Sequence, residues 1–91
     1  MDEEGWRRFI DLCLKAESPM RLSTIFRLFL TSEERSSISK RILIIEELLK
    51  GEKTQREMAK DLKVSIAKIT RGSNELKEVE EGLKQFLKRT L

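Results

Sequence analysis

The spacing of the apolar side chains constrains the fold of this chain more than any other feature. These side chains recur every three or four residues along nearly the whole sequence, which places them on one face of a helix. No segment alternates apolar and polar residues for long, as a half-buried strand does. The sequence therefore predicts an all-α fold of six short amphipathic helices.

Three apolar stripes lie in the N-terminal half. The first consists of Trp6, Phe9, Ile10, Cys13 and Leu14. The second consists of Leu22, Ile25, Phe26, Phe29 and Leu30. The third, on a longer central helix and expected to face inward, consists of Ile38, Ile42, Ile45, Leu48 and Leu49. The Ser18-Pro19 pair separates the first two helices. Thr31 and Glu34 have the capping-box spacing that opens a helix, and Gly51 is placed to end the central one as a C-cap.

A helix-turn-helix is predicted at approximately 54–78. Thr54 and Glu57 repeat the capping-box spacing, so its first helix begins near Gln55. An apolar wedge follows at the spacing typical of this motif. The wedge consists of Ala59, Leu62, Val64 and Ile69. A sixth helix is expected after residues 79–82, with the apolar set Leu83, Phe86 and Leu87.

Positive charge is concentrated in the segment Lys53–Arg71. This segment has six basic and two acidic residues, a balance of +4, whereas the whole chain carries only +3. Such a concentration is the electrostatic footprint expected of a protein that binds the phosphates of double-stranded DNA. A solvated basic helix face is the alternative, but here the charge coincides with the helix-turn-helix pattern.

The side-chain composition excludes most catalytic chemistry. The chain has no histidine and one cysteine, Cys13, which leaves no zinc ligand set, no intrachain disulfide and no nucleophile beside a base. We therefore expect no enzyme, no metal and no cofactor. No run approaches the roughly 20 apolar residues of a membrane span, so no membrane partner and a cytoplasmic location are predicted.

A chain of 91 residues is expected to form one domain, residues 1–91, with a thin core. Six amphipathic helices nevertheless present much apolar surface. Burial against a second copy in a two-fold homodimer is the simplest way to cover that surface. A monomeric helical bundle is the alternative.

A resemblance to the tryptophan repressor family covers the segment LTSEERSSISKRILIIEELLKGEKTQREMAKDLKVSIAKITRGSNELK, which contains the family's ITRGSN signature at Ile69–Asn74. The resemblance extends, more loosely, back to Trp6–Leu12 and forward to the GLKQFL segment, so it covers nearly the whole chain. It implies an all-helical, intertwined homodimer in which each chain presents a helix-turn-helix to double-stranded operator DNA. It also implies L-tryptophan as corepressor, bound between each helix-turn-helix and the shared core.

The same resemblance implies a corepressor site. Its residues are Leu28, Leu30, Thr31, Arg41, Ile45, Arg71, Gly72 and Glu75. Arg41 and Arg71 would hold the indole between two planar guanidinium groups, and Arg71 would also bind the ligand carboxylate. The backbone carbonyls of Leu28 and Leu30 would accept hydrogen bonds from the ligand ammonium group.

Two of these residues have structural alternatives. Arg41 has the spacing for a surface ion pair with Glu34 or Glu46 on the same helix. Gly72 has the alternative of an ordinary weak point in a helix, at a cost of roughly 1 kcal/mol relative to alanine. A close contact with the ligand would explain why that cost is accepted.

On the DNA side, the residues and the resemblance together predict a set of contacts, of which Arg56, Ile66, Ala67, Lys68 and Thr70 are matched to the family. The whole set consists of Lys53, Gln55, Arg56, Lys63, Ser65, Ile66, Ala67, Lys68 and Thr70. Arg56 matches the family's direct base reader, and an arginine fork onto guanine is the commonest specific contact in the major groove. Lys53 and Gln55 would contact the DNA backbone. Ser65 would cap the recognition helix, where its own backbone amide would bind a phosphate.

Three features depart from the family pattern. Lys63 and Ser65 stand in a turn where glycines are usual, so the turn has either a left-handed non-glycine residue or a different shape. Glu75 stands where a serine beside the ligand is common. Ala59 stands where the family can have a lysine, and Lys60 supplies that charge one residue later.

Residues and resemblance together predict a transcriptional repressor that depends on L-tryptophan and binds operator DNA as a homodimer. A ligand-independent helix-turn-helix protein, with a DNA-binding or architectural role, is the alternative. A helical interaction protein would explain the apolar stripes but would leave the basic segment without a purpose.

Overall fold

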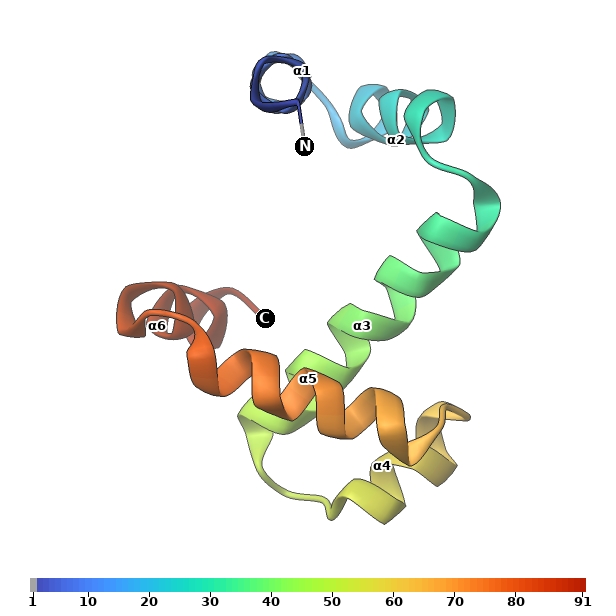
Figure 1. The fold of residues 1–91 in the computed structure, drawn as a ribbon, viewed down its shortest axis with the longest axis vertical. Coiled ribbons are helices and arrows are strands. Elements are labelled where there is room, and N and C mark those ends of the chain that lie inside the picture. Colours follow the sequence, from blue (N-terminus) through green and yellow to red (C-terminus); the bar gives the residue numbers. More distant parts are fainter. Residues whose placement is uncertain (1) are drawn as a thin grey trace. The chain divides into compact units, whose positions relative to one another are not determined.

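The structure is a computed structural model that describes residues 2–91. Six helices follow one another, and no strand occurs in this part of the chain, which confirms the all-α prediction (Figure 1). The helices are α1 (Glu3–Leu14), α2 (Pro19–Phe29), α3 (Ser32–Lys50), α4 (Gln55–Leu62), α5 (Ile66–Glu78) and α6 (Glu81–Thr90). They divide into two compact units, which meet within α3 between Ser36 and Ser37.

The N-terminal unit begins with two well-capped helices. The Asp2 carboxylate accepts hydrogen bonds from the first amides of α1. The Ser18 hydroxyl oxygen accepts from the Arg21 amide at 3.1 Å and caps α2. Pro19 is the first residue of α2, where its missing N–H would have had no partner in any case. The Ser18-Pro19 pair therefore starts α2, whereas α1 already ends at Leu14.

Aromatic side chains join α1 to α2. Phe9 lies at the centre, with its ring centroid 5.7 Å from Trp6, 6.2 Å from Phe26 and 5.5 Å from Phe29. None of the described residues of this unit is fully buried, and large apolar side chains such as Leu28 and Phe29 stay 78% and 54% exposed. The unit thus has aromatic contacts but no closed core.

The unit Ser37–Leu91 has a small core of its own. Ile44 from α3, Met58 from α4 and Ile69 from α5 are buried together. Half-buried Leu48, Ala59, Leu62 and Val64 pack around them. All four residues of the predicted wedge therefore belong to this core. Its two other buried residues, Ile44 and Met58, were not predicted from the sequence.

Within one chain, only part of the predicted inward face of the central helix is covered. Ile38 and Ile42 are about half exposed, whereas Ile44 is buried and Leu48 is half-buried. The reason is geometric, because the helix-turn-helix packs on the side of α3 that carries Ile44 and Leu48. The face with Ile38 and Ile42 finds no cover there.

The helix ends follow the predicted signals closely. Thr31 forms a capping box with Glu34, and α3 ends at Lys50, followed by Gly51 at a positive φ of 66°. Glycine suits that left-handed conformation because it has no Cβ. The sixth helix exists, but it starts two residues earlier than expected, at Glu81.

Candidate functional site

An open pocket of about 420 Å³ lies between α3 and α5 within the unit Ser37–Leu91. This volume falls in the range, about 300–1,000 Å³, that is usual for small-molecule sites. The residues that line it are Ser37, Lys40, Arg41, Ile44, Ile45, Lys68, Arg71, Gly72 and Glu75. The apolar side chains come from α3 and charged side chains come from both helices, so the pocket depends on their crossing.

The chemistry of this lining favours a ligand with three different parts. Isoleucines and a glycine offer an apolar surface for a ring system. Four cationic side chains against one carboxylate give a formal excess of three positive charges, which favours an anionic group. The carboxylate of Glu75 is the natural partner for an ammonium group. An aromatic amino acid combines these three parts.

Gly72 marks the closest approach of α5 to α3. A Cβ at this position would lie 3.0 Å from Cγ2 of Ile44 and 3.6 Å from Cδ1 of Leu48. Close packing of α5 against α3 therefore explains the glycine at position 72, an explanation that the sequence alone did not suggest. It lets the two helices cross closely enough to form one pocket.

The pocket contains five of the eight predicted corepressor residues: Arg41, Ile45, Arg71, Gly72 and Glu75. The other three, Leu28, Leu30 and Thr31, belong to the N-terminal unit and are not among its lining residues. The Leu30 carbonyl accepts a hydrogen bond from the Arg35 guanidinium at 3.0 Å, and Thr31 caps α3.

The structural alternative for Arg41 does not occur. Among residues 2–91 Arg41 makes no ion pair, because Glu34 belongs to the capping box and Glu46 pairs with Lys50 at 3.8 Å. Ser37, Lys40 and Ile44 also line the pocket but were not predicted from the sequence. Ser37 and Ile44 lie four residues before and three after Arg41, so helical spacing alone would have indicated them.

The helix-turn-helix itself has the expected local geometry. Thr54 and Glu57 form a complete capping box, with hydrogen bonds of 2.9 and 3.1 Å. The hydrogen bond from the Thr54 backbone amide lowers the pKa of Glu57. Lys63 is left-handed at φ 56° and ψ 47°, so the turn does contain a left-handed non-glycine residue. The Ser65 hydroxyl caps α5 by accepting from the Lys68 amide at 3.2 Å.

Most of the predicted DNA contacts are exposed, and four of them lie in the first two turns of α5. Ile66, Ala67, Lys68 and Thr70 are all exposed, as are Arg56 on α4 and the turn residues Lys63 and Ser65. The Thr70 hydroxyl donates to Oε1 of Gln55 at 3.0 Å. This bond joins the N-terminal turns of α4 and α5 and leaves the Gln55 amide group free to donate.

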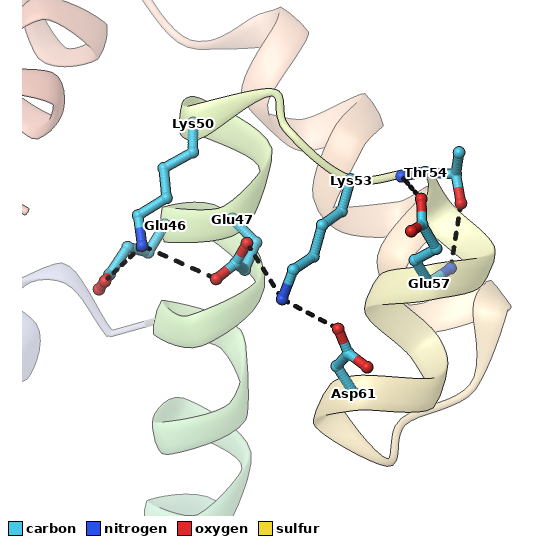
Figure 2. A network of polar contacts seen from close by, with 7 residues as sticks. All are labelled: Glu46, Glu47, Lys50, Lys53, Thr54, Glu57 and Asp61. Carbon is cyan, nitrogen blue, oxygen red and sulfur yellow. Dashed lines mark hydrogen bonds and ion pairs between the residues drawn. The ribbon is translucent and has the colours of Figure 1, made fainter.

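Lys53 differs from the other predicted contacts, because carboxylates surround it (Figure 2). Its Nζ lies 2.9 Å from Oδ2 of Asp61 and 3.8 Å from Oε2 of Glu47, and Lys50 pairs with Glu46 and with the same Glu47. The hydrogen bond to Asp61 raises the pKa of Lys53. Lys53 therefore already has anionic partners within its own chain.

Two helices joined by a tight turn, a shared buried core and a basic exposed recognition helix define the class of helix-turn-helix DNA-binding proteins. The model of the Trp repressor protein family matches residues 4–91. The chain therefore belongs to the Trp repressor family, a family of transcription regulators and not of enzymes.

Several relatives support this assignment. The Trp operon repressor homolog of Chlamydia caviae is 48% identical over 87 residues, which cover 96% of this chain and 86% of the relative. That of Chlamydia trachomatis serovar D is 46% identical over 90 residues, covering 99% and 96%. That of Vibrio parahaemolyticus is 40% identical over 83 residues, covering 91% and 81%.

Two further properties concern residues 2–91 only. No helix in this range is long and apolar enough to cross a membrane. No group of three or more metal-binding side chains comes together in the same range.

Proposed function

We propose that this protein is a repressor that binds operator DNA as a homodimer when L-tryptophan occupies the pocket between α3 and α5. The observation that carries the proposal is the double role of α5. One side of this helix lines the pocket through Arg71, Gly72 and Glu75, and its first turns present the exposed residues of the DNA-binding surface. A ligand in the pocket acts on the position of α5, and thus on its fit to DNA.

Each pocket residue interacts with a different part of the ligand. Arg41 and Arg71 stack on the indole, and Arg71 also binds the carboxylate. Ile45 and Gly72 contact the ring edge, while Glu75 attracts the ammonium group. Leu28, Leu30 and Thr31 stay a prediction of the family resemblance, because they do not line this pocket. The Leu30 carbonyl, which accepts from Arg35, has a second lone pair that could accept from an ammonium group.

The DNA-binding surface combines one base reader with several backbone contacts. Arg56 reads guanine in the major groove. Gln55, Lys63 and Ser65 contact phosphates, and the exposed first turn of α5 enters the groove. Ile66, Ala67 and Lys68 lie in that turn, and Thr70 lies at the start of the next. We place the protein in the cytoplasm, where a bacterial repressor of this family meets its DNA.

Homodimer formation is supported by the N-terminal unit. Apolar side chains that are at least 50% exposed include Trp6, Leu14, Met20, Leu28 and Phe29. Large apolar side chains left exposed in such number on two neighbouring helices indicate an interaction surface. A second copy covers it symmetrically without any other partner.

The decisive experiment is a titration of the protein against a palindromic trp-type operator and a scrambled duplex, at fixed salt, with and without saturating L-tryptophan. We expect tighter operator binding with L-tryptophan and no such gain on the scrambled duplex. Equal operator binding in both conditions would instead favour the ligand-independent DNA-binding or architectural protein. Absence of binding to either duplex would contradict the DNA function.

Arg41→Met tests the ligand pocket within the same assay. It should remove most of the gain due to L-tryptophan and leave the weak ligand-free binding unchanged, because Arg41 lies on α3 and is not one of the proposed DNA contacts. Arg27→Met on α2 is the matched control, since it removes an exposed arginine outside the pocket. Retention of the full gain in Arg41→Met would exclude the pocket as the corepressor site.

Glu75→Ser tests the proposed partner of the ammonium group. L-tryptophan has this group and indole-3-propionate lacks it. The substitution should therefore weaken the binding of L-tryptophan alone, by about threefold to tenfold for the loss of one ion pair. Isothermal calorimetry with both ligands gives the two affinities. Equal changes for both would show that Glu75 does not distinguish the ammonium group.

A further inference from the structure

We propose that Lys53 is a positioning residue that holds α4 in place, and that it does not contact the DNA backbone as the sequence predicted. The proposal rests on the proposed DNA-binding function, since it concerns how the helix-turn-helix is held for that task. It starts from the ion pairs drawn in Figure 2.

Lys53 lies in the short connection between α3 and α4, next to the residue that caps α4. Its ammonium group is 2.9 Å from Asp61 in the last turn of α4 and 3.8 Å from Glu47 near the end of α3. One side chain thus joins the connection to both of the helices that it links.

The partners are held well enough for this role. The Glu47 side chain is only 18% exposed and also lies 3.8 Å from Lys50, whereas the closer partner, Asp61, is 48% exposed. The Lys53 side chain itself is 35% exposed. An isolated exposed ion pair contributes little, but a network with one partly buried member restricts geometry more than it adds stability.

The capping box acts at the other end of α4. Thr54 and Glu57 fix its first turn, and the pair of Lys53 with Asp61 fixes its last turn. With both ends held, the orientation of α4 against α3 is defined before DNA binds. Such preorganisation improves affinity without any contact to the ligand.

The two roles predict opposite effects for Asp61→Asn. If Lys53 contacts a phosphate, removal of its competitor Asp61 strengthens DNA binding. If Lys53 positions α4, the same substitution weakens it. Glu52→Gln is the matched control, because Glu52 is the exposed neighbour of Lys53, makes no ion pair among residues 2–91, and its substitution changes the net charge equally.

The experiment measures operator affinity at a series of salt concentrations with saturating L-tryptophan. We expect Lys53→Met and Asp61→Asn each to weaken binding by about twofold to fivefold for each helix-turn-helix, and the double variant to weaken it no further. The slope of log affinity against log salt should stay as in the parent for Lys53→Met, whereas loss of a phosphate contact reduces its magnitude by about 0.9 for each copy in the dimer. Lys53→Arg should restore the parent affinity.

Two other readouts separate positioning from a general loss of structure. Binding of L-tryptophan should be unchanged, because neither Lys53 nor Asp61 lines the pocket. Amide exchange in α4 of the DNA-free protein should accelerate equally in both single variants. If neither the parent protein nor any variant binds DNA, the proposed function is wrong. The amide exchange of α4 then still tests whether Lys53 positions that helix.

Three results would overturn the proposal. One is that Asp61→Asn binds the operator more tightly than the parent, by at least as much as Glu52→Gln does. Another is a lower salt slope in Lys53→Met by the amount of one phosphate contact per copy. The third is parent-like amide exchange in α4 of both single variants.

Discussion

The two units of this chain differ in how far they bury their apolar side chains. In the unit Ser37–Leu91, three side chains from three helices are buried together, and glycine at position 72 lets α5 approach α3 closely. In the N-terminal unit the aromatic rings touch one another, yet none of the described residues is fully buried. The helix-turn-helix is thus built on a core from its own chain, whereas α1 and α2 need cover from elsewhere.

The difference separates the sources of stability. Burial of a large apolar side chain contributes roughly 1.5–3 kcal/mol, and a side chain left in water contributes little of this. Substitutions in the helix-turn-helix core should therefore act within one chain. Substitutions in α1 and α2 should act through the association of two chains.

The largest effect is expected for Ile69→Ala. Ile69 is fully buried against Ile44 and Met58, and such truncations cost about 2–5 kcal/mol through lost burial and the cavity left behind. Urea unfolding measures the free energy. Ile66→Ala is the matched control on the same helix, because Ile66 is 48% exposed and should cost less than about 0.5 kcal/mol. Similar losses for both variants would contradict the assignment of the core.

A smaller but substantial effect is expected for Phe29→Ala. Within one chain this ring is 54% exposed and touches Phe9, so a monomer would lose little by its removal. Burial against a second copy raises the loss to about 2 kcal/mol, and it appears as weaker dimerisation. Sedimentation at several protein concentrations measures the dimer dissociation constant. An unchanged constant would show that another surface carries the dimer contact.

Local signals in the sequence predicted the helices well. Both capping boxes, the Pro19 break and the Gly51 end depend on the chemistry of a few neighbouring residues, which the sequence contains in full. The buried face of α3 could not be predicted in this way. Its apolar residues occur on more than one side, and the choice of Ile44 over Ile42 depends on where α4 and α5 pack.

The site shows the same limit. The resemblance indicated Arg41 and Arg71, and the structure places both at one pocket. Lys53 looked like a phosphate contact because the sequence shows its charge but not its partners. Asp61 is eight residues away, and its approach to 2.9 Å depends on the fold of the whole connection.

The two capping boxes allow a comparison of the units under acid conditions. Hydrogen bonds from the backbone amides of Thr31 and Thr54 lower the pKa values of Glu34 and Glu57 below the ordinary 4.5. A carboxylate with a lowered pKa stabilises the fold above its ordinary value, and this stabilisation is lost as pH falls through the lowered one. Glu57→Gln should therefore destabilise the protein at neutral pH and have no effect in strong acid.

Glu34→Gln should behave in the same way if both capping boxes are equally well formed. Thermal unfolding across the range from about pH 2 to 7 measures both effects, which should be smaller than the loss for Phe29→Ala. A constant difference between Glu57→Gln and the parent at all pH values would show that the charge of Glu57 is not involved.

The smallest effect is expected for Lys63→Gly, and its sign is opposite to the others. A left-handed non-glycine residue costs roughly 1–2 kcal/mol, whereas glycine costs roughly 0.5–1 kcal/mol in backbone entropy, so the substitution should stabilise the fold by about 0.5 kcal/mol. The same freedom should make the turn between α4 and α5 more mobile without ligand. Urea unfolding and amide exchange of residues 62–66 measure the two consequences. If the parent turn already exchanges as fast as an open loop, Lys63 does not restrain it, and the helix-turn-helix owes its order to the core around Ile69 alone.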